Sequence, residues 1–262
     1  QKLGAGGDRD ATATAHSRHY LGWLAQRADA TRRADRDTLR ETDLEFENIR
    51  AAWLHAAQAG LHDALGRSAV ALMSHCDIRG RLDEGLALLG DAAASPRVAD
   101  EPWLRARLQA LAAHLTYRLD DFDTALASAQ RLLADEVAAA DVVARQQCLR
   151  VLGSIHLQKA ELDAAREYFT RAHGEAANAG QTLSAAAMLD NLATVEKRAG
   201  RYAEALRMAQ ESLVLMRRAG AHADVALCLN GLGVLHQALL DPERAQACFD
   251  EGLAITEREG FV

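Results

Sequence analysis

The chain has 262 residues, of which 49% are hydrophobic, 5% are aromatic and 3 are proline. This composition favours helix over strand and is sufficient for a large core. The formal net charge of −7 argues against a general nucleic-acid-binding protein, because such a protein needs a basic face. No apolar run approaches the roughly 20 residues of a membrane span, and no signal peptide is evident.

Near the front of the chain, residues 11–60 lack the periodicity of the rest. The glycines between Gly4 and Gly7 are not followed by the Gly-Lys-Ser/Thr of a phosphate loop, so we expect residues 1–10 to form a flexible linker. Helical patterns over residues 15–28 and 41–60, separated by a polar loop, predict a helical hairpin over residues 11–62 that caps the first repeat. Because the sequence begins with Gln1 and not with Met, we expect it to be part of a longer protein.

Beyond this hairpin, a pattern recurs with a constant spacing. Small residues dominate two columns, and a Leu, Ala or Phe follows the second column by four positions. The first column is Met73, Ala113, Gly153, Ala193 and Gly233, and the second is Gly85, Ala125, Ala165, Ala205 and Ala245. The third is Leu89, Ala129, Phe169, Ala209 and Phe249. An internal period of this length, about 40 residues, is typical of a solenoid.

Each repeat is predicted to be two antiparallel helices joined by a tight turn. The small residue of the first helix lets the second helix approach closely, and the aromatic or leucine side chain fills the space between one hairpin and the next. Gly200 is expected to end a first helix, and Asp241-Pro242 to cap and begin the last helix. The predicted fold class is therefore all-α, a right-handed α-solenoid of antiparallel helix pairs.

The array resembles the tetratricopeptide repeat family. The resemblance rests on Leu152-Gly153, Leu232-Gly233, Ala165/Phe169 and Ala245/Phe249. HEAT repeats, which also have about 40 residues, are the competing assignment, although the Gly/Ala/Phe offsets favour tetratricopeptide repeats. The resemblance implies a superhelix over residues 63–262, with repeats at about 66–105, 106–145, 146–185, 186–225 and 226–262. The usual unit has about 34 residues, and we expect the extra residues to lengthen both helices.

The front segment resembles a second group, the bacterial signal-transducing ATPase (STAND) and LuxR-type transcription regulators. The residues that carry this resemblance are His19-Tyr20-Leu21, Glu45, Glu47-Asn48-Ile49-Arg50, Trp53 and Gly80 to Leu89. In that group an ATPase module and a winged helix precede a repeat array. The resemblance implies that this chain is the C-terminal sensor part of such a regulator.

The sequence contains no catalytic signature, which predicts a protein that is not an enzyme and needs no cofactor or metal. No G-x-S-x-G or H-E-x-x-H motif occurs. His156 and His236 occupy equivalent positions two repeats apart and are interpreted as packed side chains, since zinc needs about four converging ligands. The four cysteines form no C-x-x-C pair, so we expect reduced core thiols in a cytoplasmic protein. Cys148, which lies near Arg145 and Arg150, is the one that hints at redox sensing.

A partner is expected in the concave groove that the first helices of such arrays line. Polar side chains recur in the groove-facing columns, and cations recur among them, although the chain is acidic overall. The candidates are Arg107, His114, Tyr117, Arg118, Gln147, Arg150, Ser154, Gln158, Asp190, Asn191, Thr194, Arg198, Asn230 and Gln237. They point to a peptide, a protein segment or a small anionic effector. A solvated face without a ligand is the alternative interpretation.

Two functions therefore compete. The first is an interaction and sensing module of a larger regulator, which acts by binding and contacts neither nucleic acid nor membrane. The second is a self-association module, because Leu253 and Ile255 lie on a helix that would leave apolar surface open for a second copy.

Overall fold

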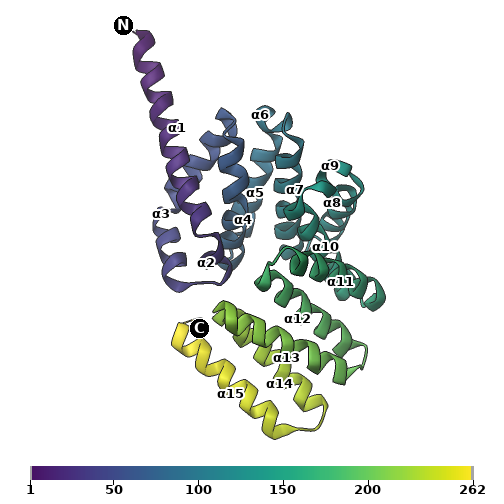
Figure 1. Ribbon diagram of the computed structural model, residues 1–262. Coiled ribbons are helices and arrows are strands. Elements are labelled where there is room, and N and C mark those ends of the chain that lie inside the picture. The colour runs from purple at the N-terminus through teal and green to yellow at the C-terminus, as the bar shows by residue number, and fades with distance from the viewer. Residues whose placement is uncertain (1, 261–262) are drawn as a thin grey trace. The chain divides into compact units, whose positions relative to one another are not determined.

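The computed structural model describes residues 2–260, and the side chains of residues 9–260. Every regular element in this range is a helix (Figure 1). The chain divides into two compact units, unit 1 over residues 1–148 and unit 2 over residues 149–262. None of the helices in the described range is long and apolar enough to cross a membrane.

Unit 1 opens with a pair of long helices. The elements are α1 (Lys2–Gln26), α2 (Ala28–Arg32) and α3 (Arg36–Ala59). The helix α1 begins at Lys2, within the segment that was expected to be a linker, and α2 lies in the expected polar loop. The helix α3 begins at residue 36 because the Asp35 carboxylate accepts a hydrogen bond from the Thr38 amide at 2.8 Å and so caps it.

The long helices pack onto the first repeat. Both α1 and α3 contact α4. The Trp53 side chain is fully buried in this core. Its indole N–H donates a hydrogen bond of 2.9 Å to the Leu88 carbonyl. This bond joins α3 to the second helix of the first repeat hairpin.

Five helical hairpins follow, with the predicted period. Their first helices are α4 (His62–Ile78), α7 (Pro102–Arg118), α10 (Val142–Gln158), α12 (Thr182–Arg198) and α14 (His222–Ala238). Their second helices are α5 (Leu82–Ala94), α8 (Phe122–Ala134), α11 (Leu162–Asn178), α13 (Tyr202–Ala219) and α15 (Pro242–Glu259). Equivalent helices begin at the same interval throughout, so the predicted repeat of antiparallel helix pairs is confirmed.

The extra length of the repeat is used in two ways. In α11, α13 and α15 it gives second helices of 17 or 18 residues. In the first two hairpins the second helix stops after 13 residues, and a short helix follows, α6 (Pro96–Ala99) or α9 (Glu136–Ala140). Ser95 and Asp135 are extended at these breaks. The break at Ser95 follows from the next residue, Pro96, which disfavours a helical conformation in the residue before it.

The turn inside each hairpin has the same construction. One residue per turn adopts a left-handed conformation, and these residues are Gly80, Asp120, Ala160, Gly200 and Leu240. The amide of the following residue closes the turn on the first helix, as when Arg201 N–H donates to the Glu196 carbonyl at 2.9 Å. Asp241 caps the last helix by accepting from the Arg244 amide at 3.1 Å, with Pro242 in the first turn, as predicted.

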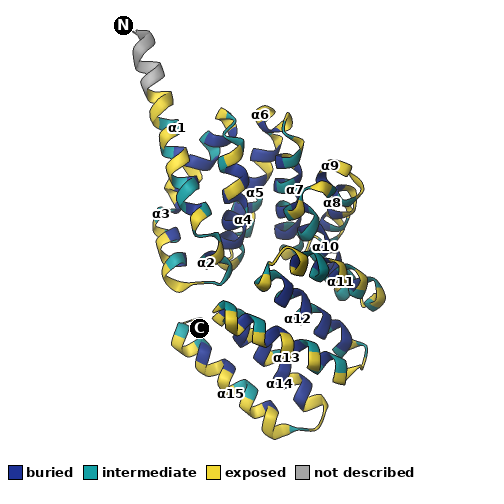
Figure 2. Cartoon of the chain, viewed as in Figure 1, coloured by how far each residue is buried: buried dark blue, intermediate teal, exposed yellow. Residues whose placement is uncertain are grey.

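The small-residue columns lie where the two helices of a hairpin touch. A Cβ atom at Gly153 would lie 2.6 Å from Cε1 of Phe169, a side chain of the same hairpin that is fully buried. The phenyl ring therefore packs against the backbone of its own first helix, whereas the sequence analysis placed it between hairpins. In unit 2 the burial differs from helix to helix. The helix α12 is buried along most of its length, and α15 is exposed on one side (Figure 2).

Candidate binding surfaces

In unit 1, the predicted cations of α7 make contacts with neighbouring helices. Asp77 of α4 accepts a hydrogen bond from His114 Nε2 at 2.8 Å and forms an ion pair with Arg118. The Tyr117 ring lies 6.5 Å from the His114 ring, centroid to centroid. His114 is buried, whereas Arg118 remains exposed beyond its ion pair.

The guanidinium of Arg107 makes three contacts. Its Nη2 lies 2.6 Å from Oδ2 of Asp141, and its Nη1 donates to the Gly66 carbonyl at 3.1 Å. Its guanidinium also lies 5.2 Å from the centroid of the Trp103 ring. The hydrogen bond to Gly66 joins α7 to α4, and the ion pair joins α7 to the residue before α10. Because the Asp141 side chain is only 7% exposed, this ion pair has a structural role. Gln147, also predicted to face the groove, is buried.

In unit 2, the predicted residues come from three first helices, α10, α12 and α14. Arg198 donates to the Leu157 carbonyl at 2.7 Å, which joins α12 to α10. Thr194 donates to the carbonyl of Asp190 in its own helix. Four of the predicted side chains are exposed, and these are Gln158, Arg198, Asn230 and Gln237. Five are half-buried, Arg150, Ser154, Asp190, Asn191 and Thr194.

Two carboxyl groups of unit 2 influence each other. Burial raises the pKa of Asp190 on α12. Burial also raises the pKa of Asp224 on α14 to about 6, and the charge of Asp190 adds to this shift. Sequence reasoning found Asp190 but missed Asp224, which becomes its neighbour only when α12 and α14 pack together.

His156 and His236, which occupy equivalent positions in the repeat, lie in the last turn of their first helices. His156 pairs with Glu161 and stacks on the Tyr168 ring at 5.3 Å. His236 Nδ1 lies 3.9 Å from the Asp241 carboxylate. The equivalent residue between them, Glu196, is buried and paired with Arg201, so the column holds a pair across each of these turns. Within the described side chains, no group of three His, Cys, Asp or Glu residues is arranged to hold a metal ion.

The cysteines are free thiols, and three of them are buried in the core as expected. Burial raises the pKa of Cys76 and that of Cys148 to about 12. A thiol with such a pKa carries little thiolate at neutral pH. The hint of redox sensing at Cys148 is therefore not supported.

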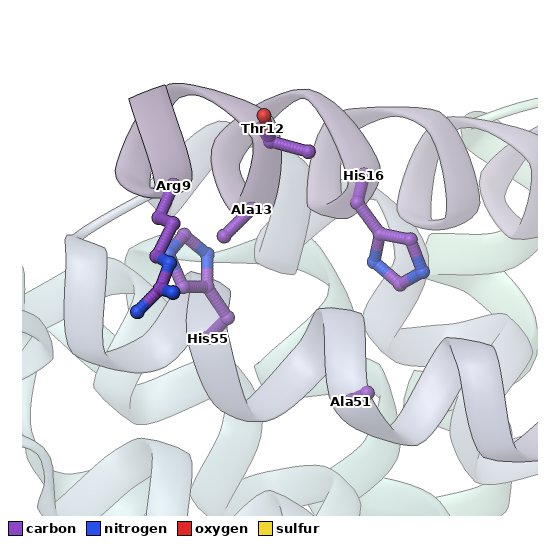
Figure 3. Close-up of a pocket in the computed structure, with 6 residues that line it drawn as sticks. All are labelled: Arg9, Thr12, Ala13, His16, Ala51 and His55. Atoms are coloured by element: carbon purple, nitrogen blue, oxygen red, sulfur yellow. The ribbon is translucent and has the colours of Figure 1, made fainter. Parts of the chain in front are cut away.

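A cleft that the sequence analysis did not predict lies between α1 and α3 (Figure 3). It has a volume of about 490 Å³, and the residues that line it are Arg9, Thr12, Ala13, His16, Ala51 and His55. The signal in the sequence is the spacing, because residues 9, 13 and 16 share one face of a helix, as do residues 51 and 55. Arg9 was overlooked because residues 1–10 were interpreted as a linker.

Beside the cleft, Ser17, His55 and Asp10 form a chain in which each residue lies close to the next. Ser17 Oγ lies 3.0 Å from His55 Nδ1, and His55 Nε2 lies 3.8 Å from Oδ1 of Asp10. Ser17 is fully buried and donates to the Ala13 carbonyl at 2.9 Å. A nucleophile must reach its substrate, so this serine serves to orient His55 and is not placed for catalysis.

Comparison with known proteins agrees with the repeat architecture. Residues 184–258, which span α12 to α15, match the family model of the tetratricopeptide repeat. No curated protein matches by sequence.

Solved structures resemble the chain over most of its length. BtubC (BKLC) from P. vanneervenii has a TM-score of 0.59 at 18% identity and covers 92% of each chain. Aspartyl phosphate phosphatase F from Bacillus subtilis has a TM-score of 0.61 at 12% identity, covering 94% of this chain and 76% of its own. The apo form of RapI has a TM-score of 0.56 at 11% identity, covering 92% and 77%. At such identities the likeness is one of fold.

Proposed function

We propose, from the tetratricopeptide repeats of residues 184–258, that this chain acts by binding a protein or peptide along the first helices of unit 2. The observation that carries the proposal is the stack of equal hairpins, because repeat arrays expose extended surfaces and usually function through them. We name the exposed and half-buried side chains of α10 from residue 149, α12 and α14 the first-helix surface.

The chemistry of the first-helix surface suits a peptide main chain. Gln158, Asn230 and Gln237 each offer an amide donor and acceptor, which match the N–H and C=O groups of an extended segment. The exposed end of Arg198 can bind a carboxylate of the partner. The pair of Asp190 and Asp224 can bind a cationic side chain. A small anionic effector is the second candidate ligand, and it would rely on Arg198 and Arg150.

Unit 1 would contribute less to such binding. Arg107 and Arg118 already pair with Asp141 and Asp77, so a ligand would have to compete with these ion pairs. Within unit 1, the groove residues from the sequence analysis thus support the contacts between hairpins more directly than they support a ligand.

The test is a quantitative capture experiment followed by calorimetry on the purified partner. The variant carries Gln158→Ala, Asn230→Ala and Gln237→Ala together. A matched control carries Thr170→Ala and Gln210→Ala, which change exposed residues of the second helices α11 and α13. We expect the partner to bind the wild type and the control equally and the variant at least about tenfold more weakly. Equal binding to all three would reject the first-helix surface.

We also propose that the chain is not an enzyme. The support is the buried position of Ser17, a serine that contacts His55, which in turn lies near Asp10. Hydrolysis of acetyl phosphate and of p-nitrophenyl esters is the direct assay. Turnover above the uncatalysed rate that is lost in Ser17→Ala would overturn this part of the proposal.

We infer a cytoplasmic signalling or transcription regulator of bacteria as the setting. The support is the resemblance of His19-Tyr20-Leu21, of Glu47 to Arg50 and of Gly80 to Leu89 to the regulators with an ATPase module. Sequencing of the gene upstream of the Gln1 codon tests the inference. An ATPase module with a phosphate loop and a winged helix would support it, and an unrelated upstream domain would reject it.

Self-association is the second candidate function, and exposed apolar side chains favour it. Leu227 is 69% exposed on α14 and Leu253 is 56% exposed on α15. Analytical ultracentrifugation over a range of concentrations tests it, with Leu227→Glu and the control Leu44→Glu on α3. A dimer that only Leu227→Glu dissociates would support self-association. A monomer at all concentrations would reject it.

A further inference from the structure

The cleft between α1 and α3 gathers nitrogen donors from two helices. Arg9 and His16 lie on one face of α1, and their side chains point toward α3 (Figure 3). His55 reaches into the same space from α3, where Ala13 and Ala51 leave room because their side chains are short. The lining contains no carboxylate, although Asp10 lies beside His55 at 3.8 Å.

The orientation of His55 is set by a short hydrogen-bond chain. The Ser17 hydroxyl donates its proton to the Ala13 carbonyl, so its oxygen is left to accept from Nδ1–H of His55. This assignment places a proton on Nδ1, so Nε2 can donate to a ligand oxygen only when the ring carries its second proton. Because Ser17 is fully buried, the imidazole is held from behind by a fixed partner.

We propose that the cleft between α1 and α3 binds a small phosphorylated molecule, with Arg9 and His55 holding its phosphoryl group and His16 facing the remainder of the molecule. The guanidinium of Arg9 provides a permanent positive charge that pairs bidentately with phosphate oxygens. The imidazolium form of His55 adds a second positively charged donor beside Arg9, whereas His16 lies at the other end of the cleft, opposite Ala51 (Figure 3). The cleft is open to solvent, and its volume of about 490 Å³ leaves room for the remainder of a metabolite-sized ligand.

This site is separate from the proposed function. It lies on the long helices of unit 1 and uses none of the residues of the first-helix surface. Either proposal can therefore fail while the other stands. A phosphorylated ligand here would give unit 1 a sensing role alongside the binding role of unit 2.

The experiment is isothermal titration calorimetry of the whole chain with ribose 5-phosphate, compared with ribose, inorganic phosphate and acetate. We expect ribose 5-phosphate and inorganic phosphate to bind and ribose to give no signal. Acetate should bind at least about tenfold more weakly than phosphate. The decisive variant is Arg9→Gln, with Arg18→Gln as the matched control, because Arg18 is an exposed arginine of the same helix outside the cleft.

Arg9→Gln should weaken ribose 5-phosphate binding about tenfold or more, which corresponds to about 1.4 kcal/mol. Arg18→Gln should leave it within about twofold of wild type. Imidazole NMR signals of His16 and His55 should shift during the titration, while those of His222 in unit 2 stay fixed. The proposal is overturned if no phosphate compound binds at about 10 mM, if both arginine variants behave alike, or if the His16 and His55 signals do not move.

Discussion

Replacement of Gly153 by alanine tests how the hairpins pack. The added Cβ atom would lie 2.6 Å and 2.7 Å from two ring atoms of Phe169, well inside van der Waals contact. Phe169 is fully buried and has little room to withdraw. Overpacking of this kind costs about 1–3 kcal/mol, against a gain in helix propensity of about 1 kcal/mol. The net change should therefore lie between neutral and about 2 kcal/mol of destabilisation.

The matched control is Gly231→Ala in α14. A Cβ atom there meets nothing within 4 Å, so this variant should gain the helix propensity alone, about 1 kcal/mol. The difference between the two alanine variants then isolates the contact with Phe169. Amide hydrogen exchange in unit 2 is the appropriate assay, because repeat arrays need not unfold in one step.

A double-mutant cycle with Phe169→Ala sharpens the test. Phe169→Ala alone should cost about 3–5 kcal/mol through the cavity that it leaves. In that background Gly153→Ala should become stabilising, as the pair Ala193 and Ala209 in the next hairpin indicates. The reasoning is refuted if Gly153→Ala stabilises the wild-type chain as much as Gly231→Ala does, or if the cycle shows no coupling.

Three further predictions concern single positions. Leu240 has a φ of 61° and is 89% exposed, so Leu240→Gly should relieve backbone strain and stabilise by about 1 kcal/mol, seen as a rise in Tm of about 2–4 °C. Burial lowers the pKa of His75 to about 4, below its value of 6.5 when unfolded. Below pH 6.5 the unfolded state thus binds more protons, and about 2 kcal/mol of stability should be lost by pH 5 in denaturant titrations, a loss that His75→Leu removes. The pKa of Asp224 is raised from 3.8 to about 6, so its ionisation removes stability as the pH rises between these two values. Asp224→Asn should therefore stabilise unit 2 by about 1–3 kcal/mol at pH 7 and by less at pH 5, measured by hydrogen exchange.

The periodic part of the fold was predictable because the packing constraint repeats. A close approach of two helices needs a small residue at a fixed position, and Gly153 and Gly233 meet the rings of Phe169 and Phe249 at the same offset. At the hairpin turns, residue type alone would predict a glycine at each left-handed position, and this prediction is wrong at three of them. Ala160 and Leu240 adopt the left-handed conformation that usually favours glycine, because the hairpin geometry around them is fixed.

The parts that were not predictable depend on contacts without a period. The start of α3 depends on one capping hydrogen bond from Asp35, which sequence reasoning interpreted as part of a loop. The cleft between α1 and α3 depends on Arg9, within a glycine-containing segment whose composition disfavours helix. The raised pKa of Asp224 was not predictable because it results from burial and from the charge of Asp190. The sequence around these two residues does not indicate that they are buried together.

The arginines of the first helices show why column position alone does not define a ligand site. Arg118 reaches the carboxylate of Asp77, and Arg198 reaches the carbonyl of Leu157, in each case on the first helix of the preceding hairpin. The same column therefore supplies a contact between neighbouring first helices in both units, although the acceptors differ. A ligand carboxylate that recruits Arg118 must displace Asp77, whereas one that recruits Arg198 gives up only a neutral acceptor. For equal exposure, unit 2 is thus the better place for an anionic group of a partner.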